Sequence, residues 1–564
     1  MSLDLTPEQK AIGKRNFEQA AADLERSRQA ANDPSRRTFM KAALAGAAVA
    51  PVSAAVYFGY ESWKGNKAVR AALIGCGDEG GVLVGDHNPE YIDIVAVVEP
   101  RPYNAKRIFD GDTGPRKGLK KVCGADKAAR IRLFDTLEEL LAKKGDLGIE
   151  MVIIATPLHL HHKMAITCME AGLHVLCEKL MARKIEYCKM MIEAAKKNKV
   201  LLSIGHQRHY SMLYAHALEV VNSGVLGDVK HIRALWHRNN SWPYDPKSAK
   251  APVVAGTEPF YRDGWFPPIY QMDKDKLDPE KLKNLDYKDI EEMVRWRVSN
   301  RTGGGLMAEL GSHQLDASSI FLGKVKPIAV SGVGGKFFYG PGRNDRESDD
   351  SVFVNFEFPG KDHPGAGHGG KNENDIVVVS YSSFNTNSFE QYGECLMGSR
   401  GTMVVEREAE VMLFKEANSG GGKTGEGGRG TAVTVNTTTA GKPAMEATST
   451  WGGSGPAAIV KAASAGSAWD SDVRGYRTEM EHFAYLVRTW DKGKGWSQGA
   501  DGKFQQDVPR CHGEIAMGDA ILALTANIAM KKKQRIEFKK DWFELGPDKL
   551  KSTPEKDFNN DEPG

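Results

Sequence analysis

The chain has 564 residues, a formal net charge of +3 and 41% hydrophobic side chains, so it is long enough for two or more domains with buried cores. A charge this close to neutral excludes a general electrostatic attraction to nucleic acid or to acidic membranes. The seven cysteines are scattered and form no C-x-x-C pair, so neither a disulfide framework nor a zinc ribbon is indicated.

The N-terminal region has the layout of an export signal. Arg36 and Arg37 precede an uncharged, alanine-rich stretch at 42–60, which is typical of twin-arginine (Tat) export. The alternative is an amphipathic cytosolic helix with a chance arginine pair, but no polar face appears before Glu61. We therefore expect an exported, periplasmic protein. Cleavage near 52–54 and an uncleaved membrane anchor both stay open, because a bilayer span needs about 20 apolar residues.

The first strand predicted after this segment, 69–74, ends in the pattern G-x-G-x-x-G. In a dinucleotide-binding loop Gly75 makes the tight turn, Gly77 lets the backbone approach a pyrophosphate, and Gly80 lets the next helix pack on the sheet. Free N–H groups in that helix's first turn would meet the phosphate charge. Alone the pattern is weak, since a glycine-rich loop is often only a turn.

A second strand, 92–98, supports the dinucleotide interpretation. It ends in Glu99, near the position where an acid accepts hydrogen bonds from the adenosine ribose. A carboxylate there repels a 2′-phosphate and favours NAD, whereas Arg101 would allow NADP by pairing with that phosphate. We expect NAD, with NADP possible.

Strands and helices then alternate to about residue 204, as in βαβ units around a parallel sheet. The later elements predicted there are strands at 150–155, 174–177 and 200–204 and helices at 163–171 and 185–198. From about 229 the pattern changes to long strands, predicted at 230–236, 328–339, 351–358, 376–383 and 402–406. The predicted fold class is an α/β Rossmann domain followed by an α+β domain built on a large, mostly antiparallel open sheet.

These patterns divide the chain into an N-terminal segment (1–66), a Rossmann domain (67–204), an α+β substrate and oligomerisation domain (205–540) and a charged tail (541–564). Two low-complexity insertions, 360–374 and 417–466, are expected as loops on the second domain. A long apolar-periodic helix is expected at 508–531. The tail from Lys539 is expected to be a solvated arm.

Three motifs carry a resemblance to a known family: Thr156-Pro157 with His161, Glu178-Lys179, and the run from Gly303 to Asp316. In this order they closely resemble the glucose-fructose oxidoreductase / inositol dehydrogenase (Gfo/Idh/MocA) family, over roughly 69–535 without the insertions. Members carry T-P-x-x-x-H, E-K-P and G-G-G-x-x-x-D-x-G-x-H-x-x-D at these places. This chain departs twice, since Leu180 replaces the proline and Glu309 replaces the first aspartate.

By this resemblance, Lys179 stabilises the alkoxide that forms as hydride leaves carbon, and Glu178 lies beside the nicotinamide ribose. Lys179 also follows a strand of the parallel sheet, at the carboxyl edge where such sheets bind ligands. The alternative is a surface lysine paired with Glu178. Thr156, Pro157 and His161 are assigned to the cofactor, with His161 at its nicotinamide end.

His313 follows Glu309 by four residues and precedes Asp316 by three, so on a helix all three share one face. A histidine can take a hydroxyl proton near neutral pH, and a carboxylate can hold its ring. We predict that His313 and Glu309 are catalytic together with Lys179, and that Asp316 binds substrate. The alternative is a satisfied histidine near a helix N-terminus.

Two further residues are candidate substrate ligands. Arg208 follows the last Rossmann strand, where family members place substrate or cofactor contacts, and is predicted to be a polar clamp. Trp236, near a strand end, suits a sugar, although such a tryptophan is as often core. His159 and His162 flank His161 in a loop-like spacing without a fourth ligand nearby in sequence, so no metal site is predicted.

The resemblance implies an NAD(P)-dependent oxidoreductase that acts on the hydroxyl of a sugar or sugar derivative. Free NAD is not expected outside the cytoplasm, so an exported enzyme would retain its cofactor tightly. Two alternatives stay open: a redox-neutral NAD-dependent glycosidase or lyase on the same fold, and a non-catalytic sugar-binding homologue. The partners expected are a carbohydrate substrate, the Tat export machinery and further copies of this chain in a homo-oligomer, but no nucleic acid.

Overall fold

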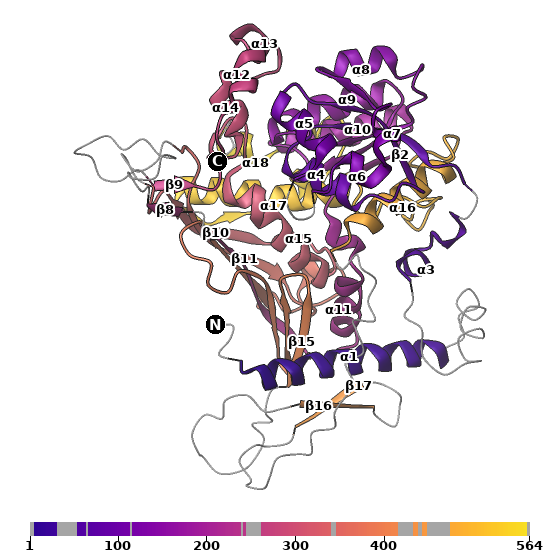
Figure 1. The fold of residues 1–564 in the computed structure, drawn as a ribbon. Coiled ribbons are helices and arrows are strands. Elements are labelled where there is room, and N and C mark those ends of the chain that lie inside the picture. Colours follow the sequence, from indigo (N-terminus) through magenta and orange to yellow (C-terminus); the bar gives the residue numbers. More distant parts are fainter. Residues whose placement is uncertain are drawn as a thin grey trace.

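The computed structural model describes residues 5–30, 53–63, 66–112, 116–238, 241–243, 261–339, 346–415, 433–437, 443–447 and 474–560. A six-stranded and an eight-stranded sheet dominate them (Figure 1). Two small two-stranded sheets accompany these, formed by β8 (Ser241–Pro243) with β9 (Tyr261–Asp263) and by β16 (Val433–Thr437) with β17 (Pro443–Ala447).

The first sheet is parallel, with the strand order β3-β2-β1-β4-β5-β6. Its strands are β1 (Val69–Ile74), β2 (Ile92–Val98), β3 (Arg132–Phe134), β4 (Met151–Ile154), β5 (His174–Glu178) and β6 (Leu202–Gly205). The connecting helices are α4 (Asp78–Asp86), α5 (Pro102–Asp110), α6 (Leu119–Cys123), α7 (Ala125–Ala128), α8 (Leu137–Lys143), η2 (Leu158–Leu160), α9 (His161–Glu170) and α10 (Ile185–Asn198). The strand order reverses at β1 and β4, and a crevice forms outside the carboxyl ends of strands at such a point.

The second sheet has the order β15-β14-β13-β7-β12-β11-β10-β18. Its strands are β7 (Val229–His237), β10 (Ala329–Gly335), β11 (Ser351–Pro359), β12 (Ile376–Phe384), β13 (Tyr392–Gly398), β14 (Gly401–Glu406), β15 (Glu410–Lys415) and β18 (Ile536–Glu537). Only the β7–β12 pair is parallel among its described neighbours. The predicted fold class is therefore confirmed, although β13, β15 and β18 were not predicted.

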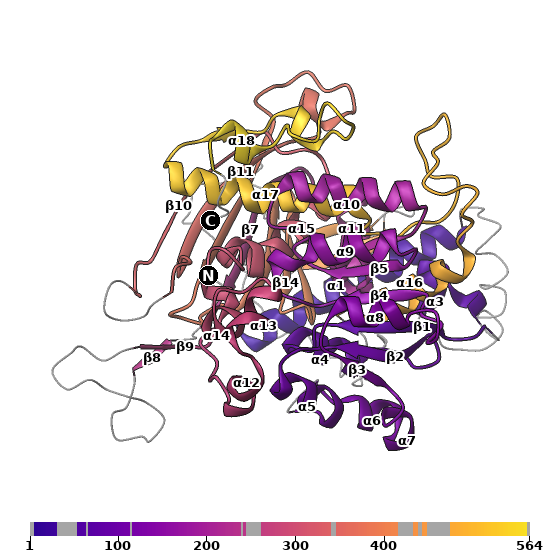
Figure 2. The same cartoon turned by 90° about the horizontal axis from the view of Figure 1, so that it is seen from above.

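The remaining helices lie between the two sheets or in the connections of the second domain. The longer ones are α11 (Met212–Asn222), α15 (Ser312–Phe321) and α17 (Gly513–Lys532). Shorter ones are η3 (Gln207–Tyr210), α12 (Gln271–Lys276), α13 (Pro279–Asn284), α14 (Ile290–Val294), η4 (Trp296–Val298), the π-helical turn η5 (Met307–Gly311) and η6 (Pro364–Ala366). Seen from above, α17 runs beside both α10 and β10 (Figure 2). By length and composition α17 could cross a membrane, but 83% of its most apolar stretch is buried inside the protein. The apolar composition of this helix is therefore explained by its packing between the domains.

A helix from late in the chain completes the first domain. α16 (Tyr476–Thr489) packs Met480, Phe483 and Leu486 into the same apolar core as β1 and β2. The core of the first domain therefore includes a helix from beyond the second sheet in addition to the residues predicted at 67–204. The local sequence of α16 shows an amphipathic helix but not which sheet it covers.

The N-terminal segment packs on the body of the protein. α1 (Pro7–Ala30) lies along the edge strand β15 (Figure 1), where Phe17 is buried and Asn16 donates a hydrogen bond to the Leu413 carbonyl at 3.0 Å. α3 (Ala54–Phe58) and η1 (Glu61–Trp63) follow, and Phe58 is buried in the fold. The arginine pair at 36–37 lies outside the described residues.

The C-terminal tail is not a solvated arm. It forms η7 (Lys540–Phe543) and α18 (Pro554–Asp557), and Trp542 is fully buried. The Lys189 ammonium donates hydrogen bonds of 2.7 to 3.1 Å to three tail carbonyls, those of Asp541, Lys549 and Ser552. The high charge of the tail predicts a solvated arm, but the buried Trp542 and the hydrogen bonds from the buried Lys189 hold the tail against the protein. The 360–374 insertion is a mostly exposed excursion, and of 417–466 only β16 and β17 are described.

Candidate active site

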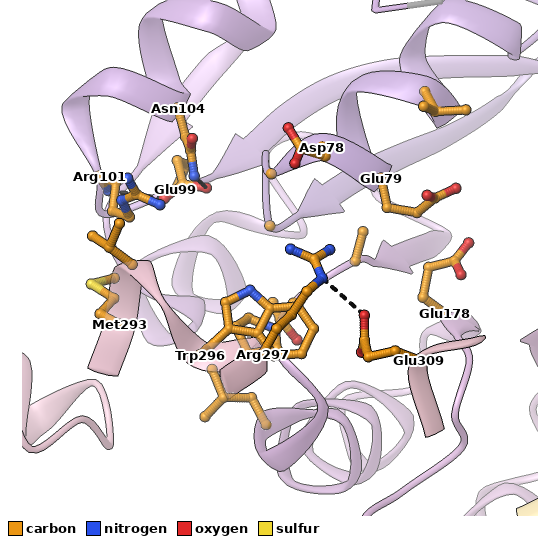
Figure 3. Close-up of a pocket in the computed structure, with 18 of the residues that line it drawn as sticks. Asp78, Glu79, Glu99, Arg101, Asn104, Glu178, Met293, Trp296, Arg297 and Glu309 are labelled. Carbon is orange, nitrogen blue, oxygen red and sulfur yellow. Dashed lines mark hydrogen bonds and ion pairs between the residues drawn. The ribbon is translucent and has the colours of Figure 1, made fainter. Parts of the chain in front are cut away.

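A cleft of about 1160 Å³ opens beyond the carboxyl ends of β1, β4 and β5 and is closed on the other side by the second domain (Figure 3). Most of the predicted site residues line it: Gly75, Gly77, Glu99, Arg101, Thr156, Pro157, Glu178, Lys179, Trp236, Glu309 and His313. Gly80, His161, Arg208 and Asp316 do not. The structure therefore gathers residues from both domains around one cavity.

The glycine loop has the shape that a dinucleotide needs. Gly75 has φ of +91°, and a Cβ there would lie 2.5 Å from the Ala155 carbonyl oxygen. A Cβ on Gly80 would lie 2.3 Å from the carbonyl oxygen of Gly75. Helix α4 can therefore pack this close to the end of β1 only because residue 80 has no side chain. At Gly77 nothing lies within 4 Å of an added Cβ, so the loop backbone faces open cleft at the start of α4. This cradle fits a pyrophosphate.

Glu99 ends β2 at the same cavity and is 5% exposed. Its carboxylate accepts hydrogen bonds from the backbone N–H groups of Cys76 at 2.8 Å and Arg101 at 2.9 Å. Burial raises the pKa of this carboxyl, while Arg101 and these N–H groups oppose the shift. The backbone bonds hold the acid at the rim of the glycine loop, which is where an adenosine ribose would lie.

Arg101 is not free to bind a 2′-phosphate. Its Nε and Nη2 donate to Asp273 Oδ2 at 3.1 and 2.9 Å, and Asp273 is fully buried. The other Asp273 oxygen accepts a hydrogen bond from the Tyr103 N–H at 3.0 Å. Because a phosphate would have to displace a buried carboxylate, the geometry favours NAD over NADP.

Lys179 reaches across the cleft to the second domain. Its Nζ donates a hydrogen bond of 2.8 Å to the Glu309 carbonyl oxygen. The next residue, Leu180, is 2% exposed, follows a cis peptide bond, and its carbonyl lies 2.8 Å from His161 Nδ1. The other ring nitrogen of His161 lies 2.8 Å from the Thr156 carbonyl. His161 therefore braces the two loops behind the cleft, and the turn that carries Lys179 is held although it lacks the family's proline.

His313 enters the cleft from α15, with 6% of its surface exposed. Burial lowers its pKa well below the usual value, and the nearby cations Lys179 and Arg208 add to the shift. The ring is therefore neutral at neutral pH and can accept a proton. Its centroid lies 5.3 Å from that of Trp236, which stacks on Tyr392 at 4.6 Å and forms an aromatic wall of the cleft.

Glu309 does not orient His313 as the helical spacing predicts. Its carboxylate accepts a hydrogen bond of 2.9 Å from Arg297 Nε (Figure 3). Burial raises the pKa of Glu309, but Arg297 and Lys179 outweigh it, and the pKa is lowered overall. Glu309 lies in the π-helical turn η5, which changes the register that an α-helix would give.

The other two predicted substrate ligands, Arg208 and Asp316, have to be corrected. Arg208 is 1% exposed and pairs with Glu394 at 2.9 Å and Glu408 at 2.5 Å, while it donates to the His313 carbonyl at 2.6 Å. It therefore supports His313 from behind. A basic residue at a domain junction can equally be a buried structural ion, and the sequence does not distinguish the two.

Asp316 is fully buried and accepts hydrogen bonds from His209 at 2.8 Å and Lys324 at 2.5 Å. It belongs to a cluster of possible metal ligands with His206 and Asp519. The Lys324 ammonium already lies 3.0 Å from Asp519, so a cation of the protein's own occupies this cluster.

Glu79 and Arg297 are among the charged residues of the cleft that were not predicted from the sequence. Glu79 could have been noticed, since it is an acidic residue inside a loop expected to meet a diphosphate. Arg297 carries no such signal because only the tertiary fold brings η4 to Glu309.

Two family models match this chain. Residues 69–206 match the oxidoreductase family with an NAD-binding Rossmann fold, and residues 283–403 match the GFO/IDH/MocA C-terminal domain. The matched residues are those of the two domains of Gfo/Idh/MocA oxidoreductases, which confirms the family resemblance seen in the motifs for these residues. The first of the two is an NAD-binding Rossmann domain.

Similar proteins agree with this assignment. The chain is 27% identical over 169 residues to levoglucosan dehydrogenase of Pseudarthrobacter phenanthrenivorans, covering 30% of this chain and 41% of that protein. It is 27% identical to a glycosyl hydrolase family 109 protein of Stenotrophomonas maltophilia, covering 36% and 43%. The matches span less than half the length of such curated relatives. An inositol dehydrogenase homologue from Azotobacter vinelandii, solved with NADH and myo-inositol, shares the fold at a TM-score of 0.51 and 15% identity, covering 84% of this chain and 98% of that one.

Proposed function

We propose that this protein is an NAD-dependent oxidoreductase that oxidises a CH–OH group of a sugar or sugar derivative. The observation that carries the proposal is that Lys179 from the first domain and His313 from the second face one cleft, which also contains the glycine loop. The names of relatives such as levoglucosan dehydrogenase support a carbohydrate substrate.

Bound NAD supplies the hydride acceptor, and the residues of the cleft supply the rest. Lys179, anchored on the Glu309 carbonyl, donates a hydrogen bond to the substrate oxygen and stabilises its developing negative charge. The neutral His313 takes the hydroxyl proton. The alcohol thus loses one hydride and one proton and becomes a carbonyl. The Trp236–Tyr392 wall offers an apolar face on which a sugar ring can pack.

The test replaces the ammonium and keeps the stem of the side chain. Lys179→Met should lower the rate of NADH formation with the best substrate of a sugar panel by about a hundredfold or more, because one charged donor to the oxyanion is lost. Nucleotide content should stay at the wild-type level. Lys163→Met is the matched control, since Lys163 lines the same cleft but pairs with Asp286. An unchanged rate in Lys179→Met would remove this residue from the mechanism.

A redox-neutral glycosidase or lyase is the second candidate, supported by the name of the family 109 glycosyl hydrolase relative. It predicts release of a leaving group from glycosides without net accumulation of NADH. A non-catalytic sugar-binding role predicts binding of the same compounds without any turnover. One panel of sugars and glycosides, followed for both NADH and leaving group, separates the three.

The cofactor is also proposed to be tightly retained. In support, the segment that contains α12 lies against the first domain beside the adenosine end of the cleft. Tyr270 stacks on Tyr103 with ring centroids 3.7 Å apart, and Lys276 pairs with Asp135 at 2.5 Å. Nucleotide that stays at a fixed ratio through purification and dialysis would agree with retention. Apoprotein that requires added NAD would contradict it.

We propose further that the protein is exported through the Tat route and is not anchored in a membrane. What argues against an anchor is that the end of the 42–60 stretch packs in the fold: Ala54, Phe58 and Tyr60 are buried. The remaining 42–53 is too short for a bilayer span of about 20 residues. The wild type should be recovered from the periplasm without detergent, and an Arg36→Lys/Arg37→Lys variant should stay in the cytoplasm. Intact chain in the cytoplasm of the wild type would contradict export.

A further inference from the structure

The cleft contains a second acidic pair that the proposed hydride transfer does not use. Glu79 lies in the first turn of α4, next to the glycine loop, and Glu178 ends β5. Both line the cleft, and Figure 3 shows their carboxylates on the same side of it. The Oε1 atoms of both are buried and have no hydrogen-bond partner among the described residues.

The backbone around the pair is shaped to hold these carboxylates in place. Glu178 pairs in register with Gly205 of β6, and a Cβ on Gly205 would lie 2.8 Å from Glu178 Oε1. The Lys179 N–H donates to the other oxygen of Glu178 at 3.3 Å. Glu178 is 5% exposed, whereas Glu79 is half-buried at the cleft wall. Each acid thus keeps one buried oxygen without a hydrogen-bond partner among the described residues.

The surrounding charges come from both domains. The charged and titratable groups that face the pair are Lys179, Arg297, Glu309, Arg474 and Tyr476. Burial raises the pKa of Glu79 in spite of three of these cations. Burial, and then the charge of Glu79, raise the pKa of Glu178 well above its usual value. Two neighbouring carboxyls of this kind resist the loss of their last proton, because a second negative charge would then face the first.

We propose that Glu79 and Glu178 form a proton-storing pair whose charge follows the redox state of the nicotinamide bound beside Lys179. The oxidised ring carries a positive charge that the reduced ring lacks, so an ionised pair stabilises the oxidised form. When hydride leaves the alcohol, the positive charge disappears and the pair takes up the proton that the alcohol releases. When hydride returns to a carbonyl, the pair gives the proton back. Each direction conserves two electrons and one proton within the cleft.

His313 can pass this proton on but cannot store it, because its own pKa is lowered well below the usual value. The pKa of each carboxyl in the pair is raised instead, so the proton is held by the pair. Such storage suits an enzyme that never releases its cofactor, since hydride and proton are then kept together between two half-reactions. The inference rests on the proposed function. In it, Glu79 acts through the charge that it shares with Glu178 beside the nicotinamide, and it does not contact the substrate.

The test measures cofactor preference and needs no substrate. The full-length protein is equilibrated from about pH 6 to about pH 9 with an excess of NAD⁺ and NADH at a fixed ratio, and the two forms are quantified in the bound fraction. In the wild type the bound NAD⁺/NADH ratio should rise by about tenfold as the pair ionises, which equals about 30 mV for a two-electron couple. In Glu79→Gln the rise should move to lower pH, because the charge of Glu79 no longer adds to the burial that raises the pKa of Glu178.

Asp78→Asn is the matched control, because Asp78 is the neighbouring acid of the same helical turn but is exposed and paired with Arg107 at 2.8 Å. It should follow the wild type. Glu178→Gln is a second variant with one carboxyl in place of two if Glu79→Gln does not fold, and its profile should also depart from that of the wild type. A flat wild-type profile, or a wild-type profile in Glu79→Gln, would overturn the pair. Wild-type protein that binds neither nucleotide would instead contradict the proposed function itself.

Discussion

Single side chains in this protein act through partners that lie far away in the sequence, and Arg101 is the clearest case. Its pairing with the buried Asp273 favours NAD, so Asp273→Asn should raise the affinity for NADP⁺ relative to NAD⁺ by about tenfold, because the guanidinium becomes free to pair with a 2′-phosphate. Binding titrations with both nucleotides measure this. Asp275→Asn on the exposed side of α12 is the control and should leave the ratio unchanged. An unchanged ratio in Asp273→Asn would show that Arg101 does not set the preference.

A second residue-scale prediction concerns pH. His174 is 7% exposed, burial lowers its pKa to about 4, and its Nδ1 accepts a hydrogen bond of 3.0 Å from the Leu201 N–H. Between about pH 6.5 and pH 4 the unfolded chain protonates this histidine while the folded chain does not, so its contribution to stability is lost as the pH falls.

His174→Gln should therefore reduce the pH dependence of the unfolding free energy in this range, by up to about 1.4 kcal/mol per pH unit. Urea denaturation of the wild type and the variant at several pH values measures the difference, in which the other titrating groups cancel. His368→Gln, at an exposed position, is the control. Parallel curves for wild type and His174→Gln would contradict the prediction.

At the scale of elements, helix α16 belongs to a domain that ends in sequence long before it. Phe483 is fully buried against the core of the first sheet. Phe483→Ala should lower the unfolding free energy by about 3–5 kcal/mol, as expected for a cavity at a buried aromatic. It should also weaken NAD binding, because α16 packs on α4 below the glycine loop. Thr489→Ala, at the exposed end of the same helix, should change neither quantity. Small losses in both would mean that α16 is dispensable.

At the scale of the whole molecule, the second sheet presents an open apolar face. Val333 and Phe353 are cross-strand partners on β10 and β11 and are 62% and 45% exposed. Large exposed apolar side chains grouped in this way mark interaction surfaces. We expect a homo-oligomer that pairs through this face, so Phe353→Glu should lower the molar mass measured by light scattering to that of the monomer. Leu133→Glu, an exposed apolar position on β3, is the control, and a monomeric wild type would refute the expectation.

The sequence by itself determined the elements whose causes are local. The glycine loop, the strands of the parallel sheet and the order of the family motifs follow from turn chemistry, from runs of apolar residues and from residues fixed at short spacings. This is why Gly75, Gly77, Glu99 and Lys179 were predicted at the cleft where the structure places them.

Only the tertiary structure decided what depends on distant partners. The pairing of Arg208 with two glutamates behind His313, the π-helical turn that directs Glu309 to Arg297, and the return of α16 to the first sheet each join segments more than ten residues apart. A local pattern shows that a side chain is charged or that a helix is amphipathic. Whether the charge faces a cleft or a buried counter-ion depends on long-range packing, because the free energy of a buried ion is set by its neighbours in space.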